Sequence, residues 1–267
     1  MKNWHRFTLL PFLAICFAMA APAAEDACQD PATTTPAAQS SPDPDLKLTR
    51  FPVVLGHNLT SNLFNRGNLL PFLIGSAAAL AIAPADQEIS QSMYNHAPEF
   101  GDTGETVGPI VTGSIVGGAF LASRLTQNEH FRAFGYTLAQ AYLTNGVLTQ
   151  GLKYATHRMR PNESNSKSFP SGHTTSAFTV ATVVTNYYGK KWGIPLYAFA
   201  TLVGVSRIEK GQHWPSDVVA GAALGYISGR TAILGTKREL SRQRTARLII
   251  TPTFGHDLRG ISAYLSY

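Results

Sequence analysis

The sequence predicts an all-α fold, a bundle of about six helices with a site at one end, followed by a short C-terminal β-hairpin. Two observations support the bundle. Only 14% of the 267 residues are charged, against about 25% in an average soluble domain. Six stretches also lack Lys, Arg, Asp and Glu, and each is long enough for a helix. They are Gly67–Ala85, Thr106–Ser123, Ala133–Leu152, Ser168–Gly189, Trp192–Ser206 and Val218–Gly229.

A secretory leader is expected over residues 1–24. Lys2 and Arg6 precede an apolar run, and small residues follow it, which is the pattern of a signal peptide. An uncleaved membrane anchor is the alternative, although the run is shorter than the ~20 residues of a spanning helix. Residues 25–47 are rich in Ala, Thr, Pro, Ser and Asp, so a disordered tether is expected there.

The main domain is expected over residues 48–236, and a basic segment with the hairpin over 237–267. Residues 246–254 and 261–267 resemble two short strands, expected to pack on the bundle. The chain has two cysteines, which excludes a disulfide scaffold and a cysteine-based metal site. The net charge of +6 comes from dispersed basic residues, so nucleic-acid binding is not expected.

The six stretches fit either membrane spans or buried core helices. Thr174–Tyr188 carries five threonines, and small or hydroxylated residues suit close helix packing in lipid. If all six helices cross a membrane, the positive-inside rule places the basic loops in the cytoplasm. A cleaved leader would reverse that assignment. The sequence therefore leaves open whether the bundle spans a membrane or is a periplasmic globule.

The first motif is Lys153, six residues, Arg160 and Pro161. On one helix, positions seven apart share a face and lie about 10 Å apart. Lys153 and Arg160 can then converge on one anion, and Pro161 stops the helix beside it. The alternative is an ordinary solvated basic face.

The second motif, Phe169-Pro170-Ser171-Gly172-His173, opens the next helix. Ser171 offers a hydroxyl, and the first amides of a helix point toward any anion placed there. His173 is placed to give or take a proton. The alternative is an ordinary helix cap followed by a histidine.

The third motif is Ser206-Arg207, five residues, His213, three residues and Asp217. Asp217 falls in the first turn of another helix, where it can cap the helix and reach back to His213. A carboxylate on one ring nitrogen fixes the tautomer and leaves the other nitrogen as a nucleophile. The alternative is a capping Asp beside a surface His.

Together, in this order, the three motifs resemble the signature of the type 2 phosphatidic acid phosphatase and haloperoxidase superfamily, over roughly Gly67 to Arg230. The resemblance implies that His213 attacks phosphorus and forms a phosphohistidine, that Asp217 orients it, and that His173 protonates the leaving oxygen. It also implies a phosphate site made of Lys153, Arg160, Ser171, Gly172 and Arg207. No metal or cofactor is expected, because three cations replace the magnesium of other phosphoryl-transfer sites.

The resemblance implies a metal-independent phosphatase for phosphomonoesters or diphosphates, with a lipid or polyprenol substrate and a membrane as partners. The stretch from Trp214 to Gly225 and the apolar helices favour that branch. A secreted periplasmic acid phosphatase is the alternative, a vanadium haloperoxidase is disfavoured by chain length, and a catalytically silent envelope scaffold is the non-enzyme alternative. An exported protein with an extracytoplasmic site is expected. Outside the motifs, His157 is expected to be a solvated helix residue, Lys167 a rim contact, and Arg158 a neighbour of the site.

Overall fold

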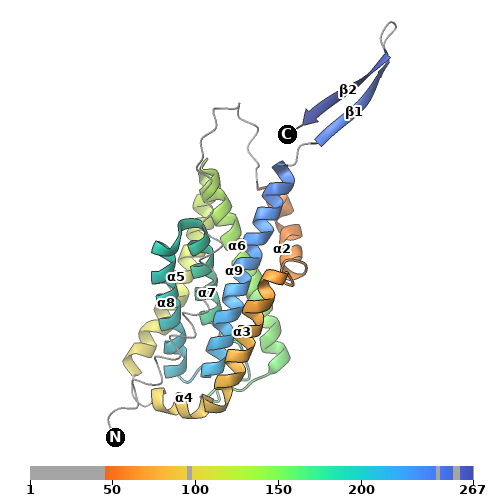
Figure 1. The fold of residues 1–267 in the computed structure, drawn as a ribbon. Coiled ribbons are helices and arrows are strands. Elements are labelled where there is room, and N and C mark those ends of the chain that lie inside the picture. The colour runs from red at the N-terminus through yellow and green to blue at the C-terminus, as the bar shows by residue number, and fades with distance from the viewer. Residues whose placement is uncertain (1–45, 95–97, 245–246, 255–258, 267) are drawn as a thin grey trace.

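The computed structural model describes residues 46–94, 98–244, 247–254 and 259–266 (Figure 1). The predicted leader and nearly all of the predicted tether lie outside these residues. The described chain is mostly helical, and six of its helices have 17 residues or more, one for each charge-free stretch. The helices are α2 (Phe51–Leu59), α3 (Arg66–Ile82), α4 (Asp86–Tyr94), α5 (Pro98–Leu125), α6 (Glu129–Thr156), α7 (Gly172–Tyr188), α8 (Lys190–Glu209) and α9 (Pro215–Arg244), with 3-10 turns η2 (Leu48–Arg50) and η3 (Ala83–Ala85). The predicted helical bundle is confirmed.

Local sequence sets several helix ends. Asn65 caps α3 by accepting a hydrogen bond from the Gly67 N–H at 2.9 Å, and Asn128 caps α6 by accepting from Phe131 N–H at 2.9 Å. Such side-chain caps satisfy amides that have no partner within the helix. At its other end α6 stops at Thr156, because His157 takes a left-handed conformation with φ 44°.

Helix α7 packs against α6, α8 and α9 in the middle of the bundle. Its five threonines are buried, and the hydroxyls of four of them donate to the carbonyl four residues earlier, as Thr179 does to Thr175 at 2.8 Å. Glycines of α9 face it. A Cβ atom on Gly221 would lie 2.9 Å from the Ser171 carbonyl oxygen, and one on Gly225 would come closer still to the Thr175 carbonyl. Glycine and threonine therefore bring the two backbones into close contact.

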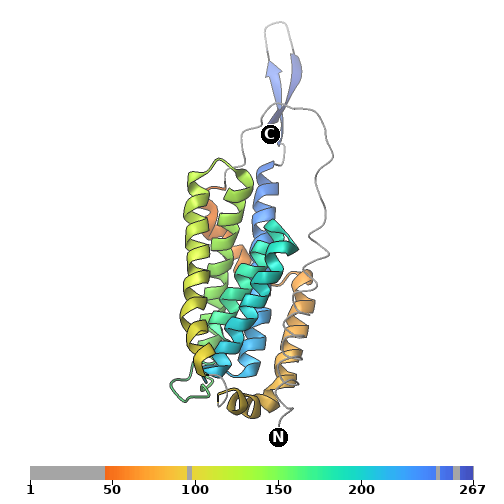
Figure 2. The same cartoon turned by 90° about the vertical axis from the view of Figure 1, so that its left-hand side faces the viewer.

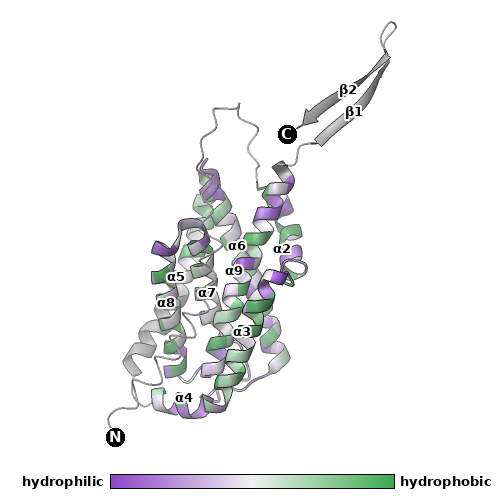
Figure 3. Ribbon diagram, viewed as in Figure 1, coloured by the Kyte–Doolittle hydropathy of each residue, from purple (hydrophilic) through white to green (hydrophobic). Residues whose placement is uncertain are grey.

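Most residues of α3 are apolar (Figure 3). Two segments of the described chain are long and apolar enough to cross a membrane, Arg66–Tyr94 and Pro215–Arg242. Most of the apolar 18-residue window of the second segment is buried inside the bundle, whereas only 17% of that of the first is buried. On α3 the exposed large apolar side chains are Leu69, Leu70, Phe72, Leu73, Ile74 and Leu80.

The bundle has two distinct ends. At one end, Arg50 pairs with Glu239 at 3.0 Å, and Asn68 bonds to Thr231 at 3.0 Å, so the start of α3 lies beside the last half of α9. At the other end, the short helix α4 lies across the bundle beside the start of α9 (Figures 1 and 2). Helices α3 and α9 are therefore antiparallel.

The two segments outside the expected main domain differ from prediction in detail. Leu46, near the end of the predicted tether, is buried beside Val54 and Tyr136. The predicted basic segment continues α9 as far as Arg244. Beyond it, β1 (Arg247–Phe254) and β2 (Arg259–Ser266) pair antiparallel and project past the end of α9 (Figure 1). A hairpin packed on the bundle is not supported.

Candidate active site

The three motifs meet at one end of the bundle. The end of α6, the start of α7 and the turn between α8 and α9 surround a cavity of about 350 Å³. Three predicted residues, Ser171, Arg207 and Asp217, are fully buried at this end. The predicted residues that line the cavity are Lys153, Arg160, Gly172, His173 and His213.

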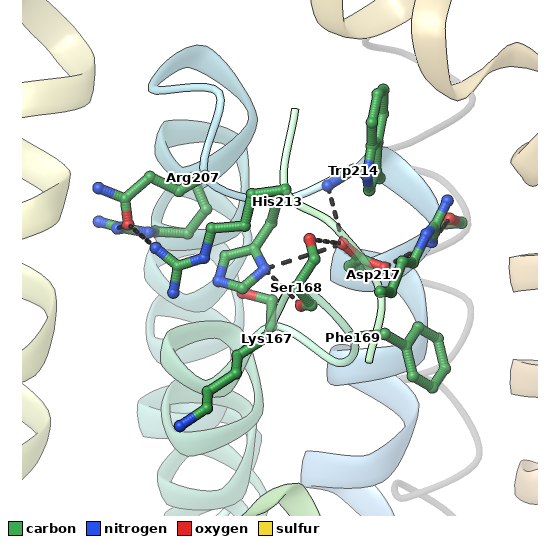
Figure 4. Close-up of polar contacts among 12 residues, drawn as sticks. Lys167, Ser168, Phe169, Arg207, His213, Trp214 and Asp217 are labelled. Carbon is green, nitrogen blue, oxygen red and sulfur yellow. Dashed lines mark hydrogen bonds and ion pairs between the residues drawn. The ribbon is translucent and has the colours of Figure 1, made fainter. Parts of the chain in front are cut away.

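His213 is held by a backbone carbonyl (Figure 4). Its Nδ1 atom lies 2.6 Å from the carbonyl oxygen of Ser168. A carbonyl oxygen only accepts hydrogen bonds, so Nδ1 carries the proton and Nε2 keeps its lone pair. Burial lowers the pKa of His213, and the cations Lys153 and Arg160 lower it further, against the opposing effect of Asp217. The ring is therefore a neutral base with a free nitrogen.

Asp217 is the carboxylate next to this ring, yet it does not hold the tautomer. Its Oδ2 lies 3.8 Å from His213 Nδ1, which is too long for a hydrogen bond but close enough for charge attraction. The same oxygen accepts from the Ser168 hydroxyl and from the Trp214 N–H at 3.0 Å, while Oδ1 accepts from Arg158. The third motif predicted that Asp217 fixes the tautomer. In the structure the carbonyl of Ser168, a residue outside the three motifs, accepts the Nδ1 proton instead.

Lys153 and Arg160 reach the cavity by different routes. Lys153 lies in the last turn of α6, where its ammonium donates to the Lys167 carbonyl at 2.6 Å. Burial, with the nearby Arg160 as a second cause, lowers the pKa of Lys153 to about 8. The prediction that both lie on one helix face is wrong, because α6 ends at Thr156 and Arg160 follows in a loop.

Gln212 joins the two arginines of the site. Its side-chain oxygen accepts from Arg160 Nη1 at 3.3 Å and from Arg207 Nη2. Arg207 comes from the last turn of α8 and Arg160 from the loop after α6, so one amide brings two distant guanidinium groups together. Gln212 was missed because it lies in the spacer of the third motif; its place directly before His213 is the only signal.

The second motif divides between the cavity and the helix interface. Gly172 and His173, the first residues of α7, line the cavity. The Ser171 hydroxyl instead contacts the Thr174 hydroxyl at 2.9 Å, and the backbone N–H of Ser171 donates to the backbone carbonyl of Asp217 at 3.0 Å. Ser171 therefore ties α7 to α9 in this structure, next to the cavity that the sequence assigned to its hydroxyl.

The residues just outside the motifs have separate places. His157 is exposed, as expected, but it ends α6 rather than continuing it. Lys167 is exposed at the rim, with its ammonium 4.8 Å from the centre of the Tyr154 ring. Arg158 contacts Asp217 directly, which the sequence did not indicate. Within the described residues, no group of three His, Cys, Asp or Glu side chains could hold a metal ion.

A second, apolar cavity of about 480 Å³ is lined mainly by residues of α5 and α6. Tyr142 of α6 lines both cavities, so the two cavities are neighbours along this helix. The α6 residues that line the two cavities follow one another at spacings of three or four positions, so they lie on one face of this helix. The residues of the apolar cavity are Leu48, Phe51, Pro52, Val116, Gly117, Phe120, Ala139, Tyr142 and Leu143.

Comparisons with known proteins identify the family of the part of the chain that carries the motifs. The model of the PAP2 superfamily matches residues 132–240, which contain all three motifs. The lipid A 4'-phosphatase of Helicobacter pylori is 31% identical over 145 residues, which cover 50% of this chain and 69% of that protein. The chain belongs to the PAP2 superfamily. The family match begins in α6 and ends in α9, so it includes every residue of the three motifs.

Other PAP2 relatives match shorter parts. The lipid A 1-phosphatase of Porphyromonas gingivalis is 40% identical over 90 residues, 33% of this chain and 20% of that protein. The undecaprenyl-diphosphatase BcrC of Bacillus subtilis is 36% identical over 76 residues, 28% of this chain and 38% of that protein. The chain therefore spans between a fifth and about two thirds of these relatives. The crystal structure of Aquifex aeolicus LpxE has a TM-score of 0.47, with 26% identity, over 57% of this chain and 94% of that chain.

Proposed function

We propose that this protein is a metal-independent phosphatase that hydrolyses phosphomonoesters or diphosphates of lipids or polyprenols through a phosphohistidine intermediate. The observation that carries the proposal is the hydrogen bond from His213 Nδ1 to the Ser168 carbonyl. It leaves Nε2 unprotonated in a residue that lines the cavity shared with Lys153, Arg160 and His173. A neutral nitrogen nucleophile beside two cations and a second histidine fits phosphoryl transfer.

The reaction has two steps. Nε2 of His213 attacks phosphorus while the bond to the leaving oxygen breaks, and His173 gives that oxygen a proton. Water, deprotonated by His173, then attacks the phosphohistidine, the P–N bond breaks, and phosphate leaves. Asp217, 3.8 Å from the ring, stabilises the positive charge that the ring carries in between. The charge on the phosphoryl oxygens is offset by Lys153, Arg160 and Arg207, with the Gly172 amide and the Ser171 hydroxyl beside them.

The substrate is proposed to be a lipid because an apolar cavity lies next to the polar one, with Tyr142 lining both. A phosphate at His213 would leave a hydrocarbon chain pointing along α5 and α6. The names of the relatives support the same class, since they are phosphatases of lipid A and of undecaprenyl diphosphate. The alternative, a periplasmic acid phosphatase for soluble esters, has no use for this cavity and is not favoured.

The protein is proposed to sit in the cell envelope with its site outside the cytoplasm. The apolar surface of α3 and the two candidate spans support attachment to a membrane. Lys190, Lys191, Lys237 and Arg238 lie at the end of the bundle opposite His213. The positive-inside rule would place that end in the cytoplasm.

The proposed function is tested with the full chain in detergent. Phosphate release is measured from a long-chain lipid phosphate and from a polyprenyl diphosphate, with and without excess EDTA. Hydrolysis that persists in EDTA, disappears in His213→Gln and remains in His57→Gln is the expected result. His57 is a matched control because it is an exposed histidine on α2, at the far end of the bundle. No hydrolysis of either lipid, or a complete and reversible loss in EDTA, would contradict the proposal.

The side of the membrane is tested by labelling. Ser164→Cys, in a chain whose Cys16 and Cys28 are replaced by serine, places a thiol on the exposed loop between the first two motifs. A maleimide that cannot cross membranes should label it in intact spheroplasts. Labelling only after lysis would place the site in the cytoplasm.

A further inference from the structure

Two charged residues outside the three motifs lie behind the carboxylate that faces His213. Arg158 Nη1 donates to Asp217 Oδ1 at 2.6 Å and to the Ser216 hydroxyl at 2.8 Å, and its Nη2 donates to Asp86 Oδ2 at 2.7 Å. The side chains of Asp86 and Asp217 are only 5% and 0% exposed. One guanidinium group therefore bridges two buried carboxylates from α4 and α9.

Both ends of this bridge are fixed. Asp86 accepts from the Ser216 N–H at 2.8 Å and from the Ser216 hydroxyl at 2.5 Å, at the start of α9, where a helix favours negative charge. The Arg158 guanidinium also lies 5.7 Å from the centre of the Trp214 ring, and the Trp214 indole N–H donates to the Met159 carbonyl at 2.8 Å. The loop after α6, helix α4 and helix α9 thus meet at Arg158.

We propose that Arg158 and Asp86 are positioning residues. Arg158 fixes the place of Asp217 and offsets its charge so that His213 stays neutral until it attacks phosphorus, and Asp86 holds Arg158 in place and takes a share of its charge. This rests on the proposed function of the same site. The oxygens of Asp217 are already occupied by Arg158, the Ser168 hydroxyl and the Trp214 N–H. The carboxylate is therefore held 3.8 Å from the ring, where it can stabilise a positive ring without first attracting a proton to it.

The charges around His213 decide whether losing Arg158 or Asp86 favours the protonated or the neutral ring. Asp217 favours a protonated ring, and Arg158 weakens that attraction by pairing with Asp217. Without the Arg158 charge, Asp217 acts on the ring in full. Without the Asp86 charge, the Arg158 cation is paired with Asp217 alone and offsets more of its charge, which favours the neutral ring. Loss of Arg158 and loss of Asp86 therefore shift the protonation of His213 in opposite directions. The remaining charged or titratable groups at the ring are Lys153 from α6, Arg160 from the following loop, His173 from α7 and Arg207 from α8.

The test is a direct titration of His213 by NMR in protein labelled with ¹⁵N-histidine, with the signal assigned through His213→Gln. In Arg158→Gln the midpoint is expected to rise by about one pH unit, the size of a single neighbouring charge. In Asp86→Asn, which keeps the shape of the side chain, it is expected to fall. Arg158→Lys keeps the charge and should retain most of the low midpoint. Arg124→Gln is the control, because Arg124 is exposed at the end of α5.

An unchanged or lower midpoint in folded Arg158→Gln would overturn the inference, and so would a higher midpoint in Asp86→Asn. If Arg158→Gln shows no cooperative thermal transition, Asp86→Asn alone decides, since a merely structural tie would not lower the midpoint. Phosphate release by the wild-type protein is measured separately. Its absence would contradict the proposed function, whereas the titration judges the positioning role whether or not the chain is a phosphatase.

Discussion

The carbonyl oxygen of Ser168, not the carboxylate of Asp217, lies within hydrogen-bonding distance of His213 Nδ1. In a serine-protease triad, changing the aspartate to asparagine costs about 10⁴-fold because the histidine adopts the wrong tautomer. Here the backbone keeps the tautomer, so Asp217→Asn should lose only the stabilising charge. We expect kcat to fall about 10²-fold, measured on the lipid phosphate. A loss as complete as that of His213→Gln would contradict this.

Replacement of His213 and replacement of His173 should reduce activity in different ways. His213→Gln removes the nucleophile and should abolish turnover with every leaving group. His173→Ala removes the acid, which matters most for a poor leaving group. Its loss should harm an alkyl phosphate more than p-nitrophenyl phosphate, by one or two factors of about ten. Equal losses on both substrates would show that the role of His173 is misassigned.

The pH dependence of kcat/KM should have two limits. His213 must be neutral to attack, and its pKa is lowered by burial, so activity should persist below pH ~6.5, the usual pKa of histidine, and fall at lower pH. Lys153 must be charged to bind phosphate, and its pKa is lowered to about 8, so KM should rise above that pH. Lys153→Arg keeps its charge and should remove the rise in KM, while loss of the His173 proton still lowers kcat. A rise in KM that Lys153→Arg does not move would exclude Lys153 as its source.

The apolar cavity should select for a long chain. Gly117 lines it, and a Cβ atom added there meets nothing within 4 Å, so a larger side chain can enter the cavity without a clash. Gly117→Leu should lower kcat/KM for the long-chain lipid by about tenfold and leave p-nitrophenyl phosphate unaffected. The neighbouring Gly118, also open but outside the cavity lining, gives the matched control Gly118→Leu. Equal effects of both variants would argue against a chain in this cavity.

The contact between α7 and α9 should depend on Gly225. A Cβ atom there would collide with the Thr175 carbonyl, which cannot move without shifting α7. Gly225→Ala should lower the free energy of unfolding by about 1–3 kcal/mol, as overpacking does. Thermal unfolding in detergent measures it. Gly118→Ala, on the surface of α5, should be neutral or slightly stabilising.

The bundle could be predicted because charge is excluded from each long helix. The six charge-free stretches mark α3 and α5 to α9, and the polar segments between them hold the loops. The short helices α2 and α4 were missed, since α4 begins with Asp86 and carries a mixed, polar sequence. Its position across the end of the bundle depends on Ser216, which is 130 residues away in the chain.

The site residues could be found by spacing, but their contacts could not. The seven-residue spacing of Lys153 and Arg160 suggested one helix face, whereas a left-handed His157 ends the helix early. The Ser168 carbonyl has no side-chain signature, because every residue has such a carbonyl. Gln212 and Arg158 lie within the motif spacers, and only the fold shows that each joins groups from distant segments.

The threonines of α7 also bear on how apolar this helix is. A threonine counts as a mildly polar residue in a hydropathy average, yet the hydroxyls of Thr175, Thr179, Thr182 and Thr185 each donate to the backbone carbonyl four residues earlier. What such a residue presents sideways is largely its methyl group. Hydropathy averages therefore understate the compatibility of α7 with an environment that offers no hydrogen bonds. A search for membrane spans that scores a helical threonine as a residue whose hydroxyl is already bonded to the backbone would assign α7 a higher hydropathy.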